Sequence, residues 1–110
     1  MSQQVPLDEL EAAAADYGET AYAVVNSGEG PPRVTHVRVR FAGETIQILL
    51  GRGAASAARE NPAMSLVWPA SADQSMSLIV DGQAEVMEEP APETTVRVLA
   101  TRAVRHRPAP

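Results

Sequence analysis

Cysteine and lysine are both absent from this chain of 110 residues, and aromatic residues are few. The lack of cysteine excludes disulfides, thiolate metal sites and thiol nucleophiles. The lack of lysine leaves arginine as the source of all 9 basic charges. With only one Trp, one Phe and two Tyr, the core has to be built from Val, Leu, Ile and Ala.

A long apolar run and a net positive charge are also missing. No apolar run approaches the ~20 residues that a membrane span needs, and the segment MSQQVPLDEL (1–10) lacks the charged and apolar regions of a signal peptide. The formal net charge is -5, whereas nucleic-acid binding generally needs a basic stripe. We therefore expect a cytoplasmic protein that binds neither membrane nor nucleic acid, folded as one domain over residues 1–110.

The signatures of common catalytic centres are absent too. The two histidines, His36 and His106, lie too far apart in sequence to form a metal-binding motif. The chain has no Walker loop and no nucleophile elbow, and its carboxylates show no paired arrangement for acid–base chemistry. The sequence therefore predicts no metal site and leaves the catalytic residues unknown.

What is present begins with a helical pattern over residues 6–17, PLDELEAAAADY. Pro6 suits a first helical turn, and the acidic residues that follow it suit the positive helix end. Gly18 is a typical stop. One face of this helix gathers the apolar residues Leu7, Leu10, Ala14 and Tyr17.

The pattern then changes to the alternation of β-strands. Strands are predicted at 20–27, 33–43, 45–50, 64–68 and 76–88, with a short helix at 53–61. In the second strand Val37, Val39 and Phe41 point one way, while His36, Arg38 and Arg40 point the other. Gly43 and Glu44 form a tight turn, which predicts a hairpin between the second and third strands.

Two features of the last third of the chain bear on the architecture. Gly82, inside the strand at 76–88, predicts a bulge or a bend such as a barrel corner. Residues 94–106 fit both helical spacing and strand alternation, and the β-rich opening TTVRV favours a strand. About six strands and two short helices, mostly linked by hairpins, predict a small antiparallel β-barrel whose closure removes exposed sheet edges.

This order of elements resembles the pyridoxamine 5'-phosphate oxidase-like family, the FMN-binding split barrels. The segments PPRVTHVRVRFAG and TIQILLGRG are similar to the family's second and third strands. The segments ENPAMSLVWP, LIVDGQAEV and VRVLATRAVRHRP are similar to its Asn-Pro turn with the fourth strand, its fifth strand and its final strand.

The resemblance implies a six-stranded antiparallel split β-barrel with two short helices, assembled as a homodimer. It also implies an oxidoreductase that acts on an unknown small-molecule substrate, with FMN or the deazaflavin F420 bound in grooves between the subunits. The chain departs from the family in two ways. The lysine that typical members carry near Ala54 is absent, and the loop at 88–93 stands where many relatives have a helix. The alternative is a non-catalytic split-barrel dimer that binds another ligand or none.

The turn LLGRGAAS at 49–56 is the candidate phosphate site. Gly51 and Gly53 permit a positive φ and the close approach of a ligand, and Arg52 offers a bidentate contact to phosphate. The helix start favours an anion, and the backbone N–H groups predicted to lack partners there are those of Ala54, Ala55 and Ser56. The alternative is a tight strand-to-helix turn with an exposed arginine.

Arg38 and Trp68 are the remaining candidates for cofactor contact. Arg38 projects from a strand that the resemblance places beside the cofactor, and its alternative role is on a solvated face, paired with a Glu across the hairpin. The resemblance implies that Trp68 lines the pocket of the flavin ring. Its alternative role is as an anchor of the core or of the dimer interface.

Overall fold

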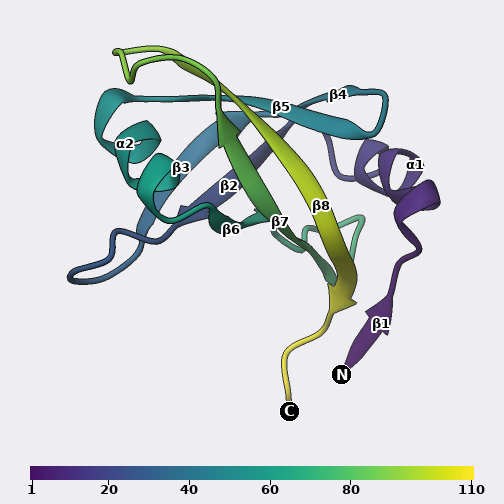
Figure 1. Ribbon diagram of the computed structural model, residues 1–110. Helices are drawn as coiled ribbons and strands as arrows, with labels where there is room; N and C mark the ends of the chain where they lie inside the picture. The colour runs from purple at the N-terminus through teal and green to yellow at the C-terminus, as the bar shows by residue number, and fades with distance from the viewer.

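The computed structural model describes all 110 residues as one curled antiparallel sheet with two α-helices and a 3-10 helix (Figure 1). The helices are η1 (Leu7–Glu9), α1 (Leu10–Ala15) and α2 (Arg52–Glu60). The strands are β1 (Ser2–Gln4), β2 (Thr20–Val25), β3 (Arg33–Arg38), β4 (Arg40–Ala42), β5 (Thr45–Leu50), β6 (Ala63–Trp68), β7 (Ser77–Val86) and β8 (Thr94–His106).

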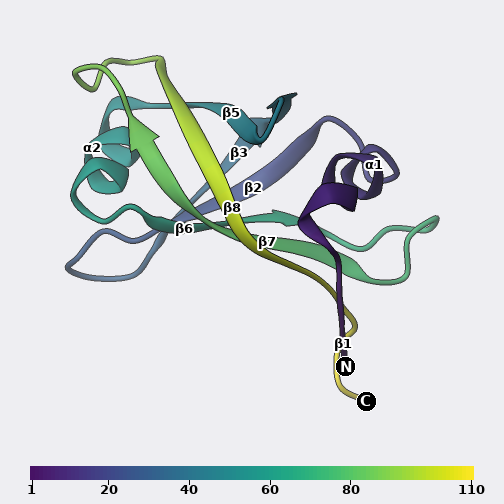
Figure 2. The same ribbon diagram turned by 45° about the vertical axis from the view of Figure 1, so that its right-hand side comes forward.

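The sheet curls because its two edge strands are neighbours in the chain. The strand order is β3-β2-β6-β7-β8-β5-β4, with β1 added beside the end of β8. Only Val39 separates the edge strands β3 and β4, so the two edges have to meet there. The N–H of Val39 donates to the carbonyl of Glu19 at 2.7 Å. Figures 1 and 2 show the resulting half-barrel, with β7 and β8 on the opposite side from β2 and β3.

The long strand β8 changes neighbour along one of its edges. Its first residues pair with β5, and its last residues, Val104–His106, pair with β1. Leu99 and Ala100 lie between these two partners. The helix α1 covers this opening beside the β4–β5 hairpin (Figure 1). Its buried residues are Leu10, Ala13 and Ala14.

The core fills the inner face of the curled sheet, and α2 covers the end opposite α1 (Figure 1). Alternate strand residues point inward. The largest fully buried side chains are Trp68, Ile46, Ile48, Leu50, Leu66, Leu78, Val25, Val80, Val96, Val98 and Thr94. From α2, Ala55 and Ala58 are buried. None of the helices has both the length and the apolar character needed to cross a lipid bilayer.

The structure confirms the predicted mainly β fold, including the strand at residues 94–106. The predicted bulge at Gly82 is also present, because Asp81 pairs with Arg102 while Gly82 pairs with Ala100. Thr101 is thus the extra residue, and the bulge lies on β8 opposite Gly82.

Three details differ from the predictions. The sheet has eight strands because β1 was not predicted and because Val39 divides the predicted strand at 33–43 into β3 and β4. The first helix is shorter than 6–17 and opens as the 3-10 turn η1. The hairpin is formed by β4 with β5, while β3 pairs with β2.

Candidate functional site

The candidate phosphate site lies where β5 ends at Leu50 and α2 begins at Arg52. Gly51 occupies the N-cap position in an extended conformation, with φ -69 and ψ 169, and no side chain caps the helix. The first backbone hydrogen bond of the helix runs from the N–H of Ala55 to the carbonyl of Gly51 at 2.9 Å. Three first-turn N–H groups therefore have no intrahelical partner: Arg52, Gly53 and Ala54.

These three amides correct the set predicted from the sequence. The helix begins one residue earlier than expected, so the N–H of Ala55 is already paired and Ser56 lies within the helical ladder. Ala55 is also fully buried, whereas Ser56 is exposed. The positive φ permitted at Gly51 and Gly53 is not used, because the glycines with positive φ are Gly18, Gly28, Gly30 and Gly43.

Arg33 makes the close approach that Gly53 permits, and the sequence pattern did not single out this arginine. A Cβ atom at Gly53 would lie 2.9 Å from Nη1 and 3.4 Å from Cζ of Arg33. The guanidinium of Arg33, the first residue of β3, therefore lies against the first turn of α2. The alternation of β3 could have indicated this position, because Arg33 lies on the same inward face of the strand as the buried Val37. A charged side chain that points inward from the first residue of a strand has to reach solvent at the end of the barrel.

The two arginines at this corner take part in no ion pair. The structure contains three ion pairs, Arg38–Glu19, Arg59–Glu89 and Arg102–Asp81, and neither Arg33 nor Arg52 takes part in one. The first turn of α2 holds no acidic residue. Two unpaired guanidinium groups and three free amides therefore surround the positive end of the helix dipole. We call this set the α2 corner: Arg33, Arg52, Gly53 and Ala54.

Arg38 does not belong to the α2 corner. It lies at the other end of β3 from Arg33, and five residues of strand correspond to about 16 Å. Its Nη1 is 3.2 Å from Oε2 of Glu19, and both side chains are exposed. The structure thus places Arg38 in a surface ion pair, which is the alternative that the sequence left open.

Trp68 is a core residue. Its side chain is 1% exposed, and its indole N–H donates to the carbonyl of Gly18 at 3.3 Å. In this conformation it presents no surface to a flavin ring. The most exposed aromatic side chain is that of Tyr22, which is 40% exposed and stacks on His36 with the ring centroids 4.7 Å apart.

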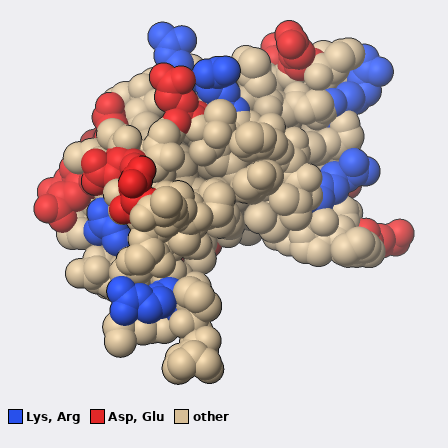
Figure 3. Space-filling model, turned by 180° about the vertical axis from the view of Figure 1, so that it is seen from behind, with Lys and Arg blue, Asp and Glu red and all other residues tan.

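Tyr22 lies on an outer face that carries few charges. Tyr22 and Val24 on β2 face His36 and Val34 on β3, and Val67 on β6 extends this row. Val34 is 64% exposed. Seen from behind, the middle of the molecule shows few charged side chains (Figure 3). We call the patch formed by the five side chains on these paired strands the uncharged face: Tyr22, Val24, Val34, His36 and Val67.

The structure holds neither a metal-binding group nor an enclosed cavity at the α2 corner. No three His, Cys, Asp or Glu residues lie together in a way that could hold a metal ion. The three main hollows of the molecule are lined by other residues than those of the α2 corner. The corner is therefore an open surface site.

Comparisons with known proteins identify the fold. A candidate pyridoxamine 5'-phosphate oxidase from Listeria innocua superposes with a TM-score of 0.71 and 12% identity, over 91% of this chain and 98% of that one. An FAD binding protein from Mycobacterium smegmatis superposes with a TM-score of 0.67 and 20% identity, over 97% of this chain and 100% of that one. An F420 reductase superposes with a TM-score of 0.63 and 16% identity, over 76% of this chain and 87% of that one.

Sequence comparison adds no nearer relative. No family model matches the chain, and no curated protein matches it. At identities of 12% to 20%, the solved structures establish a shared architecture. The chain therefore has the split-barrel fold that is shared by these pyridoxamine 5'-phosphate oxidase-like, FAD-binding and F420 reductase proteins.

Proposed function

We propose that this chain binds the phosphate of a flavin-type cofactor at the α2 corner and acts as an oxidoreductase on a small molecule. The observation that carries the proposal is the guanidinium of Arg33 lying against Gly53, beside three free amides. Structural neighbours described as an FAD binding protein and an F420 reductase support a flavin-type cofactor. FMN is our first choice, and F420 is the alternative.

The donors at the α2 corner suit a phosphate. The free amides of Arg52, Gly53 and Ala54 and the helix dipole favour an anion. Arg33 and Arg52 both offer planar guanidinium groups that bind phosphate oxygens in pairs. In our proposal these arginines take the place of the lysine that the resembling family carries near Ala54. Once bound, the cofactor supplies two-electron redox chemistry, while the chain holds it in place and excludes water.

Because the α2 corner is open, a single subunit covers little of a flavin ring. We propose that a second copy of the chain completes the site by packing on the uncharged face. The supporting observation is the exposure of the apolar residue Val34 and the aromatic residue Tyr22 on the paired strands β3 and β2. An exposed apolar patch on a soluble protein typically marks a contact with another molecule. In the homodimer, the cofactor ring would lie in the groove between subunits.

Cofactor titration tests the α2 corner directly. We expect FMN or F420 to bind the purified protein, measured by fluorescence quenching and by calorimetry. Arg33→Ala and Arg52→Ala should each weaken binding by about 1.5–3 kcal/mol, because each removes a charged hydrogen-bond donor. That loss corresponds to about tenfold or more in Kd. Gly53→Ala should also weaken binding, since its Cβ would displace the Arg33 guanidinium.

Arg107→Ala is the matched control, because Arg107 is exposed next to the C-terminal tail, away from α2. It should leave affinity unchanged. Equal affinity of the control and the Arg33→Ala and Arg52→Ala variants would reject the α2 corner as the phosphate site. The variant Arg38→Ala tests whether a partner subunit contributes to the site. It should lower affinity only if a partner subunit brings the cofactor to Arg38.

The alternative is a split-barrel dimer without redox activity that binds another ligand or none. The observation that favours it is the absence of an enclosed cavity at the α2 corner, together with the burial of Trp68. A protein that binds inorganic phosphate but neither FMN nor F420 would support this alternative.

A further inference from the structure

The largest of the three main hollows has a volume of ≈ 640 Å³ and lies at the opposite end of β5 from the α2 corner. It opens between α1, the β4–β5 turn and the stretch of β8 that has no neighbouring strand on that edge. The six residues of β5 separate it from α2 by about 20 Å. The hollow is therefore a distinct site, and a ligand bound there would not depend on the proposed cofactor.

The floor of this hollow is apolar and reaches solvent. Its apolar lining residues are Leu7, Leu10, Phe41, Ile46, Leu99 and Ala100. Leu7 is 47% exposed and Leu99 is 40% exposed, although large aliphatic side chains are usually buried. The volume lies within the range of about 300–1,000 Å³ that is typical of small-molecule sites.

The rim of the hollow carries charge of one sign only. Asp8 and Glu11 line one wall, and Glu44, from the β4–β5 turn, lines the other. None of these three carboxylates takes part in an ion pair, and no basic residue lines the hollow. Figure 3 shows acidic side chains gathered at the side of the molecule where α1 lies.

We propose that this hollow binds a small organic cation with an apolar or aromatic body. The apolar body would cover Leu7, Phe41 and Leu99, and the cationic group would lie between the carboxylates of the two walls. Charge complementarity selects this class of ligand, because an anion or a neutral molecule gains nothing from an unpaired acidic rim. Because the α2 corner carries unpaired arginines, the two sites would bind ligands of opposite charge.

A pair of probes that differ only in charge tests the proposal. Benzamidine is an aromatic cation, and benzamide is its neutral counterpart of nearly equal size. We expect benzamidine to shift the NMR signals of Leu7, Leu99 and Ala100, and benzamide to bind several times more weakly. The preference should fall as salt rises from about 0.01 M to about 1 M, where the Debye length shrinks from about 30 to about 3 Å.

Charge-neutral variants locate the interaction on the rim. Glu11→Gln and Glu44→Gln should each weaken benzamidine binding about two- to fivefold, the usual effect of a solvent-exposed ion pair, and should leave benzamide binding unchanged. Glu29→Gln, in the exposed β2–β3 loop, is the matched control and should have no effect. The proposal fails if the two probes bind equally, if the shifted signals lie elsewhere, or if all three variants behave alike.

Discussion

At the scale of single residues, the glycines show how one atom can decide packing. A Cβ atom at Gly82 would lie 2.6 Å from the carbonyl oxygen of Leu99 and 2.9 Å from Cγ1 of Val98. Both neighbours belong to β8, and the closer one is backbone that cannot rotate away. Gly82 is therefore required by the close approach of β7 to the bulge in β8, and its φ is not positive.

Gly82→Ala should destabilise the protein by about 1–3 kcal/mol, because overpacking a well-packed site forces backbone shifts. Urea unfolding would measure the loss as a lower midpoint at an unchanged slope. The matched control is Gly51→Ala, where the nearest atom to the added Cβ would be the carbonyl oxygen of Pro92, at 3.9 Å. If the Gly82→Ala protein were as stable as the control, β8 would be able to shift freely. That result would contradict the idea that only glycine permits the close approach of β7 to β8.

Residue-scale reasoning from the sequence found the α2 corner but not its full membership. The turn at Gly51–Gly53 was recognisable because a strand, two glycines and a helix follow one another within a few residues. Arg33 could not be assigned to it, because the sequence does not show that the start of β3 lies against α2. The register of β3 and the placement of α2 bring the two segments together, and both are set by non-local packing.

At the scale of elements, alternation predicted most strands because one face of each is buried. The faces of β3 agree with the pattern, since Val37 is buried and His36 and Arg38 are exposed. β1 was not predictable in this way. Its residues Ser2, Gln3 and Gln4 are all exposed and carry no alternation, so only pairing with β8 defines the strand. The break at Val39 likewise follows from closure of the sheet.

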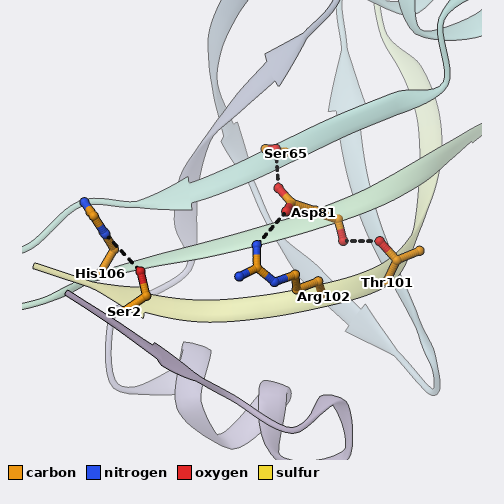
Figure 4. Close-up of polar contacts among 6 residues, drawn as sticks. All are labelled: Ser2, Ser65, Asp81, Thr101, Arg102 and His106. Carbon is orange, nitrogen blue, oxygen red and sulfur yellow. Dashed lines mark hydrogen bonds and ion pairs between the residues drawn. The ribbon is translucent and has the colours of Figure 1, made fainter.

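A polar bridge connects three strands on the outside of the sheet (Figure 4). The hydroxyl of Ser65 on β6 donates to Oδ1 of Asp81 on β7 at 2.7 Å. Nη1 of Arg102 on β8 is 3.9 Å from Oδ2 of the same carboxylate. Thr101 at the bulge donates to the backbone carbonyl of Asp81 at 3.2 Å. Asp81 is thus the central member of the bridge, directly before Gly82.

Asp81→Ala and Asp81→Asn should separate the two interactions of this side chain. Asp81→Ala removes the acceptor for Ser65 and should cost about 1–2 kcal/mol of unfolding free energy, between the values of a neutral hydrogen bond and of one to a charged group, because the carboxylate is half-exposed. Asp81→Asn keeps an acceptor oxygen and loses only the half-exposed ion pair with Arg102, so its cost should stay below about 1 kcal/mol. Chemical denaturation measures both, and equal losses would mean that the ion pair dominates the bridge.

At the scale of the whole molecule, the two candidate sites carry opposite charge. The net charge of -5 excludes a generally basic surface, yet it says nothing of where each sign gathers. Three unpaired carboxylates line the hollow beside α1, and the unpaired guanidinium groups of Arg33 and Arg52 belong to the α2 corner. Between the two ends lies the uncharged face. Only the folded arrangement shows this division, because the residues at each end come from distant parts of the sequence.

The uncharged face leads to a prediction about assembly. If a second copy packs there, Val34→Asp should convert a dimer into a monomer, because an aspartate buried at a dimer interface without a partner costs several kcal/mol. Sedimentation velocity would measure the change. The fold should survive, since Val34 is 64% exposed in the single chain. Leu49→Asp is the matched control, because Leu49 is 54% exposed on β5, on another part of the sheet.

Cofactor titration of Val34→Asp connects assembly to function. A cofactor held in a groove between subunits loses half of its site when the dimer dissociates, so Val34→Asp should weaken FMN or F420 binding. The control for this titration is Leu7→Asp, which should leave affinity unchanged, because Leu7 is 47% exposed on η1, at the opposite end of the barrel from the α2 corner. Cofactor affinity that is unchanged in a monomeric Val34→Asp protein would place the whole site within one subunit. A wild-type protein that sediments as a monomer, with or without cofactor, would reject the proposed packing on this face.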